Sequence, residues 1–301
     1  MDTPSRDLPI SFCGLTPPGC DYETAHFAVL PVPYEGTVTY QGGTAKGPHA
    51  ILDASRYVER YDEVLRAVTA DLGIHTFEPL EVPAACDLVA AEVERVAEHV
   101  IADKKVFVML GGEHSVTLGA VQAFKKTYDD LCVLQLDAHA DLRDAYGGAR
   151  CTHATVMRRC LEVAPVTQVG IRSMSKEEAD LIATAANVTT YLAHELRSQG
   201  LANLTDEILS TLTDEVYLTI DIDVFDPAYV PGTGTPEPGG LDWNEVTGFI
   251  RALSAKKQIV GFDIVEVSPQ SGTVISEFLA AKLAYRTMGC IAEAAGWLKP
   301  G

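Results

Sequence analysis

Three side chains that could bind a metal ion alternate along one short segment. Asp137, His139 and Asp141 lie in LQLDAHADLRD (134–144). On an extended backbone, alternate side chains project to the same side, about 7 Å apart per step. Two carboxylates and an imidazole on one side suit a hard-to-borderline divalent cation. A solvated strand end is the structural alternative to this interpretation.

Two further segments offer groups of the same kind. Asp221 and Asp223 close the apolar run YLTIDID (217–223), and His114 follows the glycine pair of VMLGGEHS (108–115). An Asp-x-Asp pair alone is common in an acidic chain, and a lone histidine more often caps a helix than binds a metal. Their position at the ends of apolar runs favours a shared site.

These segments together predict a centre with two metal ions. Four carboxylates crowded together without cations would repel one another and raise their pKa values. Two divalent ions would balance the four negative charges and could hold a water between them. Oxygen-rich ligation with imidazoles and no cysteine favours two Mn²⁺ per subunit, with Co²⁺ or Ni²⁺ as substitutes, over structural zinc.

The elements that must position these groups alternate between β and α patterns. Nearly continuous apolar runs predict strands at 27–33, 105–110, 132–139, 166–171, 215–223 and 258–267. Helical patterns occupy 87–104, 115–128, 201–212 and 242–257. Asp242 followed by Glu245 predicts a capping box at the last of these helices.

This alternation predicts an α/β fold around a mainly parallel sheet, in which ligands bind beyond the carboxyl ends of the strands. No change in composition divides the chain. We therefore expect a single domain over residues 1–301, with 1–26 as an N-terminal arm or edge segment.

Composition narrows the partners that the chain could bind. Its 42 acidic and 23 basic residues give a net charge of −19, which disfavours nucleic acid and anionic membranes and attracts a small cationic substrate. No apolar run approaches the roughly 20 residues of a spanning helix, and the first residues lack a secretory layout. The 7 cysteines form no CxxC, so we expect a reduced, cytoplasmic chain with mostly buried thiols.

The motifs also resemble those of a known family. GGEHS (111–115), DAHADLRD (137–144) and DIDVFDPAYVPGTGTPEPGG (221–240) are similar to the three signature segments of the ureohydrolases, the arginase/agmatinase family. The resemblance continues, in order and spacing, through YEGTVTYQGGTAKGPHAILDAS (34–55), CTHATVMRR (151–159), VGIRSMSKEE (169–178) and GFDIVEVSP (261–269). It implies a three-layer α/β/α fold and assembly as a homotrimer or homohexamer.

The resemblance implies a ligand set for two manganese ions. One ion would be held by His114, Asp137, Asp141 and Asp221. The other would be held by Asp137, His139, Asp221 and Asp223, so that Asp137 and Asp221 bridge.

The resemblance also implies two catalytic residues. His153 matches the family's proton-shuttle histidine, and Glu266 matches the acid that holds the guanidinium group. The chemistry agrees, because a guanidinium is planar, cationic and unreactive toward water. Its hydrolysis needs a metal-bridging hydroxide as nucleophile, a carboxylate to orient the cation and an acid to protonate the departing amine. Without the resemblance, a surface-loop histidine and a buried, paired acid explain these two residues equally well.

The loop LRDAYGGARCTH (142–153) bears on the substrate. It lacks the Asn and Ser residues with which arginase-type sites hold the α-amino and α-carboxylate groups of arginine. Asp144 could instead pair with a distal ammonium, as in agmatine, or be a solvated loop acid. Arg143 could face a carboxylate, as in 4-guanidinobutyrate, or pair with a nearby acid. Thr235 offers a polar contact from the turn-rich loop PGTGTPEPGG (231–240).

The whole pattern most resembles bacterial agmatinases, so we expect agmatine and water to give putrescine and urea, a step in polyamine biosynthesis. The alternatives are another ureohydrolase acting on guanidinobutyrate, arginine or formiminoglutamate, and a non-catalytic metal-binding regulatory paralogue. Intact His153 and Glu266 disfavour the paralogue. Cys151 lies two residues before His153, where a redox influence is conceivable but a packing thiol is the better interpretation.

Overall fold

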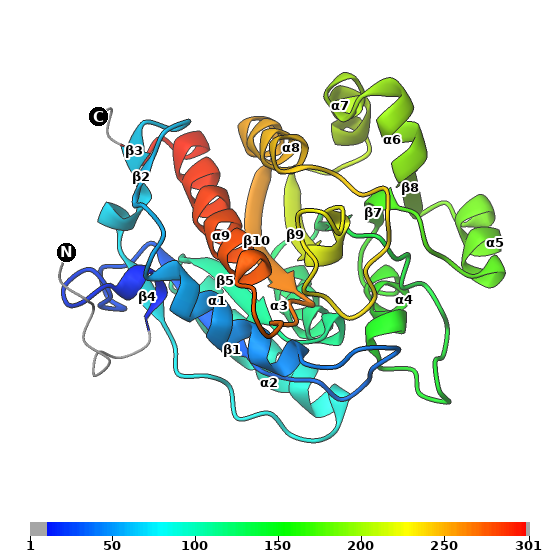
Figure 1. The fold of residues 1–301 in the computed structure, drawn as a ribbon, viewed down its shortest axis with the longest axis horizontal. Helices are drawn as coiled ribbons and strands as arrows, with labels where there is room; N and C mark the ends of the chain where they lie inside the picture. The colour runs from blue at the N-terminus through cyan, green and yellow to red at the C-terminus, as the bar shows by residue number, and fades with distance from the viewer. Residues whose placement is uncertain (1–10, 299–301) are drawn as a thin grey trace.

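The computed structural model describes residues 11–298, and its centre is an eight-stranded sheet in which every pairing is parallel (Figure 1). Its order is β4-β1-β5-β10-β9-β6-β7-β8. The strands are β1 (Phe27–Val32), β4 (Ile74–Thr76), β5 (Val106–Gly111), β6 (Cys132–Leu136), β7 (Val166–Ile171), β8 (Val188–Leu192), β9 (Glu215–Asp221) and β10 (Gln258–Val265). A separate antiparallel pair joins β2 (Tyr61–Asp62) to β3 (Ala67–Val68).

Helices cover both faces of the sheet, so the expected three-layer α/β/α arrangement is confirmed. One face carries α1 (Gly47–Ser55), α6 (Ala193–Gln199), α7 (Leu201–Ser210), α8 (Trp243–Lys256) and α9 (Ile275–Ala294). The other carries α2 (Cys86–Ala102), α3 (Thr117–Thr127), α4 (Val156–Leu161) and α5 (Lys176–Thr184). Each helical layer encloses its own apolar core against the sheet.

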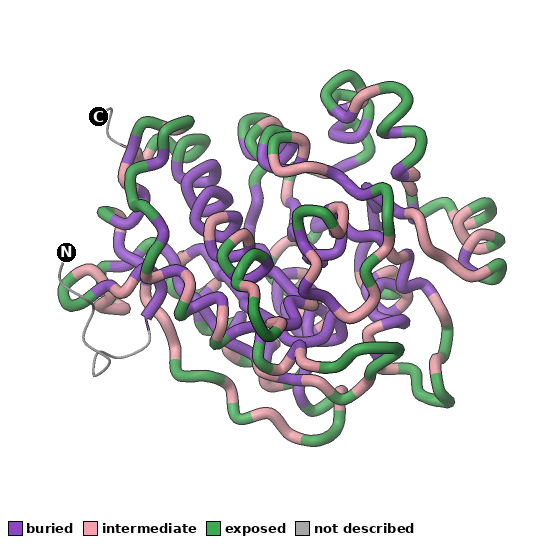
Figure 2. Tube along the Cα trace, viewed as in Figure 1, coloured by how far each residue is buried: buried purple, intermediate pink, exposed green. Residues whose placement is uncertain are grey.

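Alternation along the strands feeds both cores. In β1, Phe27 and Val29 belong to the core beneath α1 and α9, whereas Ala28 and Leu30 belong to the core beneath α2. The strands are therefore buried on both sides, and Figure 2 shows them as a buried centre under more exposed outer helices. This explains the nearly continuous apolar runs in the sequence.

All six predicted strands are present, as are the four predicted helices. The capping box at α8 is confirmed, since the amide of Glu245 donates to Asp242 Oδ1 at 2.8 Å and the amide of Asp242 donates to Glu245 Oε2 at 2.8 Å. The predicted strand over 132–139 is shorter than expected, because β6 ends at Leu136 and the chain turns at Asp137. The strands and α-helices that sequence patterns missed are β2, β3, β4, β8, α1, α4, α5, α6 and α9.

Residues 1–10 of the predicted N-terminal segment lie outside the described residues. The part from Ser11 onward lies along the edge strand β4, where the amide of Phe12 donates to Thr76 Oγ1 at 3.0 Å. Phe12 and Cys13 are buried in the core beneath α1.

One cysteine pair corrects the expectation of reduced thiols. Cys86, at the start of α2, is joined by a disulfide to Cys151, 65 residues further along the chain. The other cysteines of the described residues are free, and of these only Cys20 is not fully buried. The fold brings together two positions whose spacing in the sequence carries no pairing signal.

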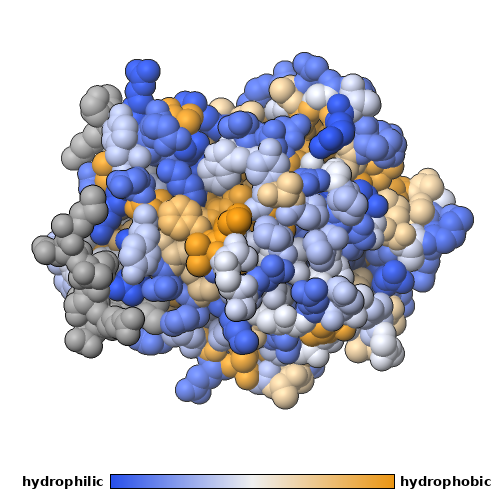
Figure 3. Space-filling model, viewed as in Figure 1, coloured by the Kyte–Doolittle hydropathy of each residue, from blue (hydrophilic) through white to orange (hydrophobic). Residues whose placement is uncertain are grey.

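The surface is largely polar on the face shown in Figure 3, where apolar side chains gather only in limited areas. Within residues 11–298, no helix is both long enough and apolar enough to pass through a bilayer.

Candidate metal centre and active site

Four neighbouring strands bring the predicted site residues to one edge of the sheet. The four strands lie in the order β5-β10-β9-β6. His114 follows β5, Glu266 follows β10, Asp221 is the last residue of β9, and Asp137 follows β6. Ligands of open parallel sheets bind at this edge, beyond the carboxyl ends of the strands. The sheet order thus joins segments that lie far apart in the sequence.

The histidine and aspartate ligand atoms form two overlapping groups. In one, His114 Nδ1 lies 3.1 Å from Asp137 Oδ2 and 3.2 Å from Asp141 Oδ2. In the other, His139 Nδ1 lies 2.9 Å from Asp223 Oδ2 and 3.7 Å from Asp137 Oδ1. Asp137 is common to both groups, as a bridging ligand would be.

Asp221 lies beside both groups without belonging to either. Its Oδ2 is 3.5 Å from His114 Nδ1, and its Oδ1 accepts a hydrogen bond from the amide of Asp223 at 2.9 Å. The structure therefore brings all six predicted ligands together: His114, Asp137, His139, Asp141, Asp221 and Asp223.

The hydrogen bonds of His114 show that this cluster fits a cation. Thr219 donates its hydroxyl hydrogen to the Asp263 carboxylate at 2.6 Å, so its oxygen accepts from His114 Nε2 at 2.9 Å. His114 Nδ1 is then unprotonated, and it is buried without a hydrogen-bond partner while facing three carboxylates. An imidazole lone pair aimed at carboxylate oxygens is the arrangement of a metal site.

Electrostatics support the same conclusion. Burial, and then the charge of Asp223, raise the pKa of Asp137 to about 7. Burial and Asp223 also raise the pKa of Asp221 well above its usual value. Asp223 differs: burial acts to raise its pKa, but the charge and hydrogen bond of His139, together with the hydrogen bond from the Ala138 amide, lower the pKa to about 2. Crowded carboxylates of this kind are stabilised by bound divalent cations.

The backbone is strained at two site residues. Asp141 has a φ of 53° and Glu266 a φ of 64°, in the left-handed region that non-glycine residues seldom occupy. Each such conformation costs about 1–3 kcal/mol and persists where the surrounding fold requires it. Here the left-handed backbone conformation turns both carboxylates toward the cluster. For Glu266 this happens directly after the end of β10.

Glu266 lies between the metal centre and the pocket. Its Oε1 accepts a hydrogen bond from the amide of His114 at 2.7 Å, and its side chain lines the pocket. Desolvation raises the pKa of Glu266 to about 8. A cation bound in the pocket would favour the ionised carboxylate and lower this pKa.

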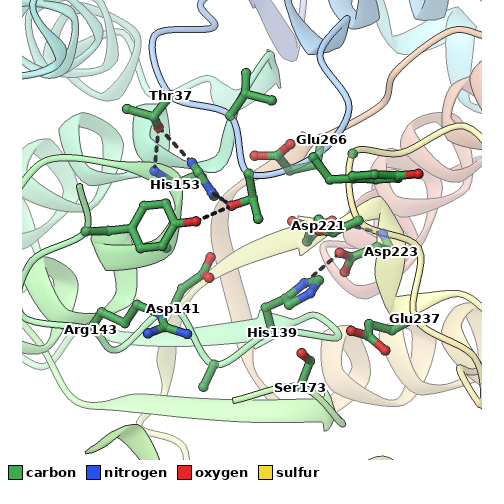
Figure 4. A pocket seen from close by; sticks show the side chains of 18 of the residues that line it. Thr37, His139, Asp141, Arg143, His153, Ser173, Asp221, Asp223, Glu237 and Glu266 are labelled. Atoms are coloured by element: carbon green, nitrogen blue, oxygen red, sulfur yellow. Dashed lines mark hydrogen bonds and ion pairs between the residues drawn. The ribbon is translucent and has the colours of Figure 1, made fainter. Parts of the chain in front are cut away.

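His153 is held through both ring nitrogens by one loop, as Figure 4 shows. Thr37 Oγ1 lies 2.7 Å from Nδ1, and Thr39 Oγ1 lies 2.7 Å from Nε2. Thr39 Oγ1 also lies 3.0 Å from the Tyr146 hydroxyl. This loop, residues 36–39, is a functional feature that motif reasoning did not identify, although it lies within a segment that carried the family resemblance.

Glu113 fixes the orientation of the Thr37 hydroxyl and, through it, the tautomer of His153. Its carboxylate accepts the Thr37 hydroxyl hydrogen at 3.0 Å and the amides of Gly36 and Thr37 at 2.6 and 2.5 Å. The Thr37 oxygen is therefore an acceptor toward His153 Nδ1, which carries a proton. Nε2 then faces the Thr39 hydroxyl with its lone pair.

The pocket itself has a volume of about 260 Å³ and opens over the metal cluster. Thr235 lines it, and so does Arg143, whose Nε lies 3.8 Å from Glu178 Oε2. Glu237, Ser173 and Tyr146 also line it and were not among the predicted residues.

Asp144 does not reach the pocket, which differs from its expected contact with substrate. Its exposed carboxylate lies 2.6 Å from Arg159 Nη2 and 3.4 Å from Arg150 Nη2. These two guanidinium groups direct Asp144 away from the metal centre.

An α/β/α sandwich with two overlapping carboxylate–histidine groups at its strand ends can hold a pair of divalent ions that activate water for hydrolysis. The model described as the Arginase family matches residues 25–290. The chain therefore belongs to the arginase family and is an enzyme, a ureohydrolase.

Individual relatives span almost the whole chain. The N(1)-aminopropylagmatine ureohydrolase of Synechocystis sp. is 43% identical over 276 residues, which cover 89% of this chain and 90% of the relative. The agmatinase of Pyrococcus horikoshii is 35% identical over 92% of this chain and 95% of its own. The crystal structure of agmatine ureohydrolase of Thermoplasma volcanium superposes with a TM-score of 0.85 at 33% identity, covering 93% of this chain and 94% of the other.

Proposed function

We propose that this chain hydrolyses the guanidino group of a linear guanidinoalkylamine, with agmatine and water giving putrescine and urea as the basic reaction. One pocket that presents Glu266, His153 and the carboxylate–histidine cluster together carries the proposal. The acidic character of the pocket and of the whole chain favours a cationic substrate.

Two Mn²⁺ ions are the proposed metal content. The residues that would hold them are His114, Asp137, Asp141, Asp221, His139 and Asp223. Oxygen-rich ligation with two imidazoles suits Mn²⁺. When bound, two such metal ions lower the pKa of a water molecule and so supply a nucleophile at neutral pH.

The chain's own residues then divide the remaining work. Glu266 orients the guanidinium through charge-assisted hydrogen bonds to its planar N–H groups. His153 Nε2 delivers a proton to the departing amine, which otherwise could not leave as a stable species. Thr37 holds the imidazole ring of His153 in this orientation by accepting a hydrogen bond from Nδ1.

An aminopropyl-extended agmatine is the second candidate substrate. Several relatives that span about nine-tenths of the chain bear the name N(1)-aminopropylagmatine ureohydrolase. Removal of urea from that molecule would leave the triamine spermidine in place of putrescine. Both candidates have a cationic far end, and both place this enzyme in polyamine biosynthesis.

The first prediction tests the reaction and its substrate class. Mn²⁺-loaded enzyme should release urea from agmatine or its aminopropyl derivative faster than it releases urea from arginine or 4-guanidinobutyrate, or formamide from formiminoglutamate. Asp137→Ala and Asp221→Ala should abolish turnover, because each removes a buried carboxylate of the metal cluster. Colorimetric urea release measures the four guanidino substrates, and formamide release measures formiminoglutamate.

Rapid cleavage of one of the other guanidines, with no urea from either amine, would refute the substrate class. Two tightly bound Mn²⁺ ions with no turnover on any of the five would instead favour a non-catalytic role.

A further inference from the structure

Glu237 is an acidic residue of the pocket whose carboxylate has no bonding partner among the described residues. It lines the pocket, yet its side chain makes no hydrogen bond or ion pair with any residue between 11 and 298. The other pocket acids outside the metal cluster are engaged: Glu266 accepts from the His114 amide, and Glu178 accepts from the amides of Leu142 and Ser175.

The main chain of Glu237, in contrast, is firmly held. Arg172 donates from Nη2 to the Glu237 carbonyl at 2.8 Å and to the Asp223 carbonyl at 2.6 Å. The Arg172 guanidinium thus links the main chain of Glu237 to the main chain of Asp223, a residue of the metal cluster. A carboxylate on a fixed backbone is pre-organised for a ligand, because less freedom is lost on binding.

The base of the loop that carries Glu237 is closed as well. Asp226 accepts from the amides of Gly239 and Gly240 at 2.7 and 3.1 Å. Phe225 and Leu241 form a β-bridge next to these bonds. A Cβ on Gly240 would collide with the main chain of Phe225 and Asp226, so this close approach requires glycine.

The charges of the pocket divide between two walls. Figure 4 shows Arg143 on one side and Glu237 on the opposite side, with the metal-cluster residues between them. Arg143 lies near the Glu178 carboxylate and over the Tyr146 ring, at 5.6 Å from its centroid. A cationic group would therefore find its unpaired counter-charge on the Glu237 wall.

We propose that Glu237 is a specificity-determining residue that binds the distal ammonium of the guanidinoalkylamine substrate and disfavours a carboxylate at that end. This inference rests on the proposed function, since it assigns the far end of a substrate whose guanidinium lies at Glu266. Arg172 is the positioning residue for Glu237, because it touches only the main chain.

Glu237→Gln tests the assignment with the fewest structural changes. We expect KM for agmatine and for its aminopropyl derivative to rise about tenfold, the loss typical of one partly exposed charge-assisted hydrogen bond, with kcat nearly unchanged. KM for 4-guanidinobutyrate should stay the same or fall, because a repulsive charge is removed. A merely structural defect would raise KM for all three substrates.

Glu78→Gln is the matched control. Glu78 is exposed, lies outside this pocket and loses the same single charge, so KM for every substrate should remain as in the wild type. Equal KM values in Glu237→Gln and Glu78→Gln for the two amines would overturn the inference while leaving the proposed reaction intact.

A binding measurement separates the two proposals. Calorimetric titration of the Mn²⁺-loaded protein with putrescine and with spermidine should show weaker binding in Glu237→Gln than in Glu78→Gln. Absence of urea release in the wild type would contradict the proposed function but not this difference. Identical amine affinities in the two variants would overturn the role of Glu237 whatever the activity.

Discussion

The two ring nitrogens of His114 face different neighbours, and the hydrogen bond made by Nε2 determines whether Nδ1 is available to a metal ion. Nε2 donates to Thr219, so Nδ1 keeps its lone pair for the carboxylate side of the cluster. Thr219 is 105 residues away in the sequence, and nothing in the segment around His114 indicates it. Histidine and aspartate ligands could be predicted from type and spacing, whereas their hydrogen-bond partners depend on the folded sheet.

Asp144 shows the converse case. It follows Asp141 closely enough to be a plausible substrate contact, but the nearby helix α4 supplies Arg159, which holds its carboxylate at 2.6 Å. The orientation of a loop side chain depends on such neighbours, and a single sequence does not rank competing partners. Glu237 was overlooked for the same reason, because its lack of partners is visible only in three dimensions.

Thr219→Val should weaken metal binding. The change removes the acceptor for His114 Nε2 at nearly constant volume, so the ring loses its fixed tautomer, and Mn²⁺ affinity should fall by about 10- to 100-fold. Thr219→Ser keeps the hydroxyl and should restore most of the affinity. Calorimetric titration of metal-free protein with Mn²⁺ measures the effect, and Thr205→Val, at a buried threonine of α7, is the control. Equal affinity in Thr219→Val and Thr205→Val would contradict this role.

At the scale of elements, the central strands were predictable because burial on both faces leaves uninterrupted apolar runs. The two edge strands lack such a run, because β4 has only 3 residues and β8 is buried only at its first residue. Helix α9 is buried over most of its length, so it lacks the polar stripe that marks an amphipathic helix. It packs between α1 and α8 on the same face of the sheet, and that packing stabilises a helix which periodicity does not indicate.

The link between α2 and the His153 segment should contribute strongly to stability. Cys86 and Cys151 are 65 residues apart, and closing a loop of that size stabilises a fold by about 4 kcal/mol in the chain-entropy model. Reduction should therefore lower the thermal unfolding midpoint by several degrees.

Differential scanning calorimetry with and without dithiothreitol measures this shift. A Cys86→Ser variant should unfold at the lower temperature in both conditions and respond little to the reductant. A wild-type midpoint that does not change on verified reduction of the disulfide would refute the stabilising role.

At the scale of the whole molecule, an excess of acidic residues surrounds a pocket that itself contains carboxylates. The net charge of −19 creates a field that concentrates small cations near the surface. Salt screens such a field over about 10 Å at 0.1 M ionic strength. The long-range charge and the pocket thus act in the same direction on a cationic substrate.

Ionic strength should therefore affect kcat/KM in a substrate-dependent way. Raising NaCl from about 0.02 M to about 0.5 M should lower kcat/KM for agmatine several-fold because the attraction is screened. The value for 4-guanidinobutyrate, which has no net charge, should change little. Steady-state urea release over a salt series gives both values, and equal salt dependence for the two substrates would argue against electrostatic attraction.

The hydrogen bonds of His153 bear on the proton transfer that we propose for this residue. Thr37 always receives the hydrogen of Nδ1, but the Thr39 hydroxyl is free to rotate, giving its hydrogen to Nε2 in neutral imidazole and turning it toward Tyr146 in imidazolium. Charging and discharging the ring then requires one bond rotation and leaves no partner orphaned. In the proposed reaction, the site would thus reset between turnovers without moving its backbone.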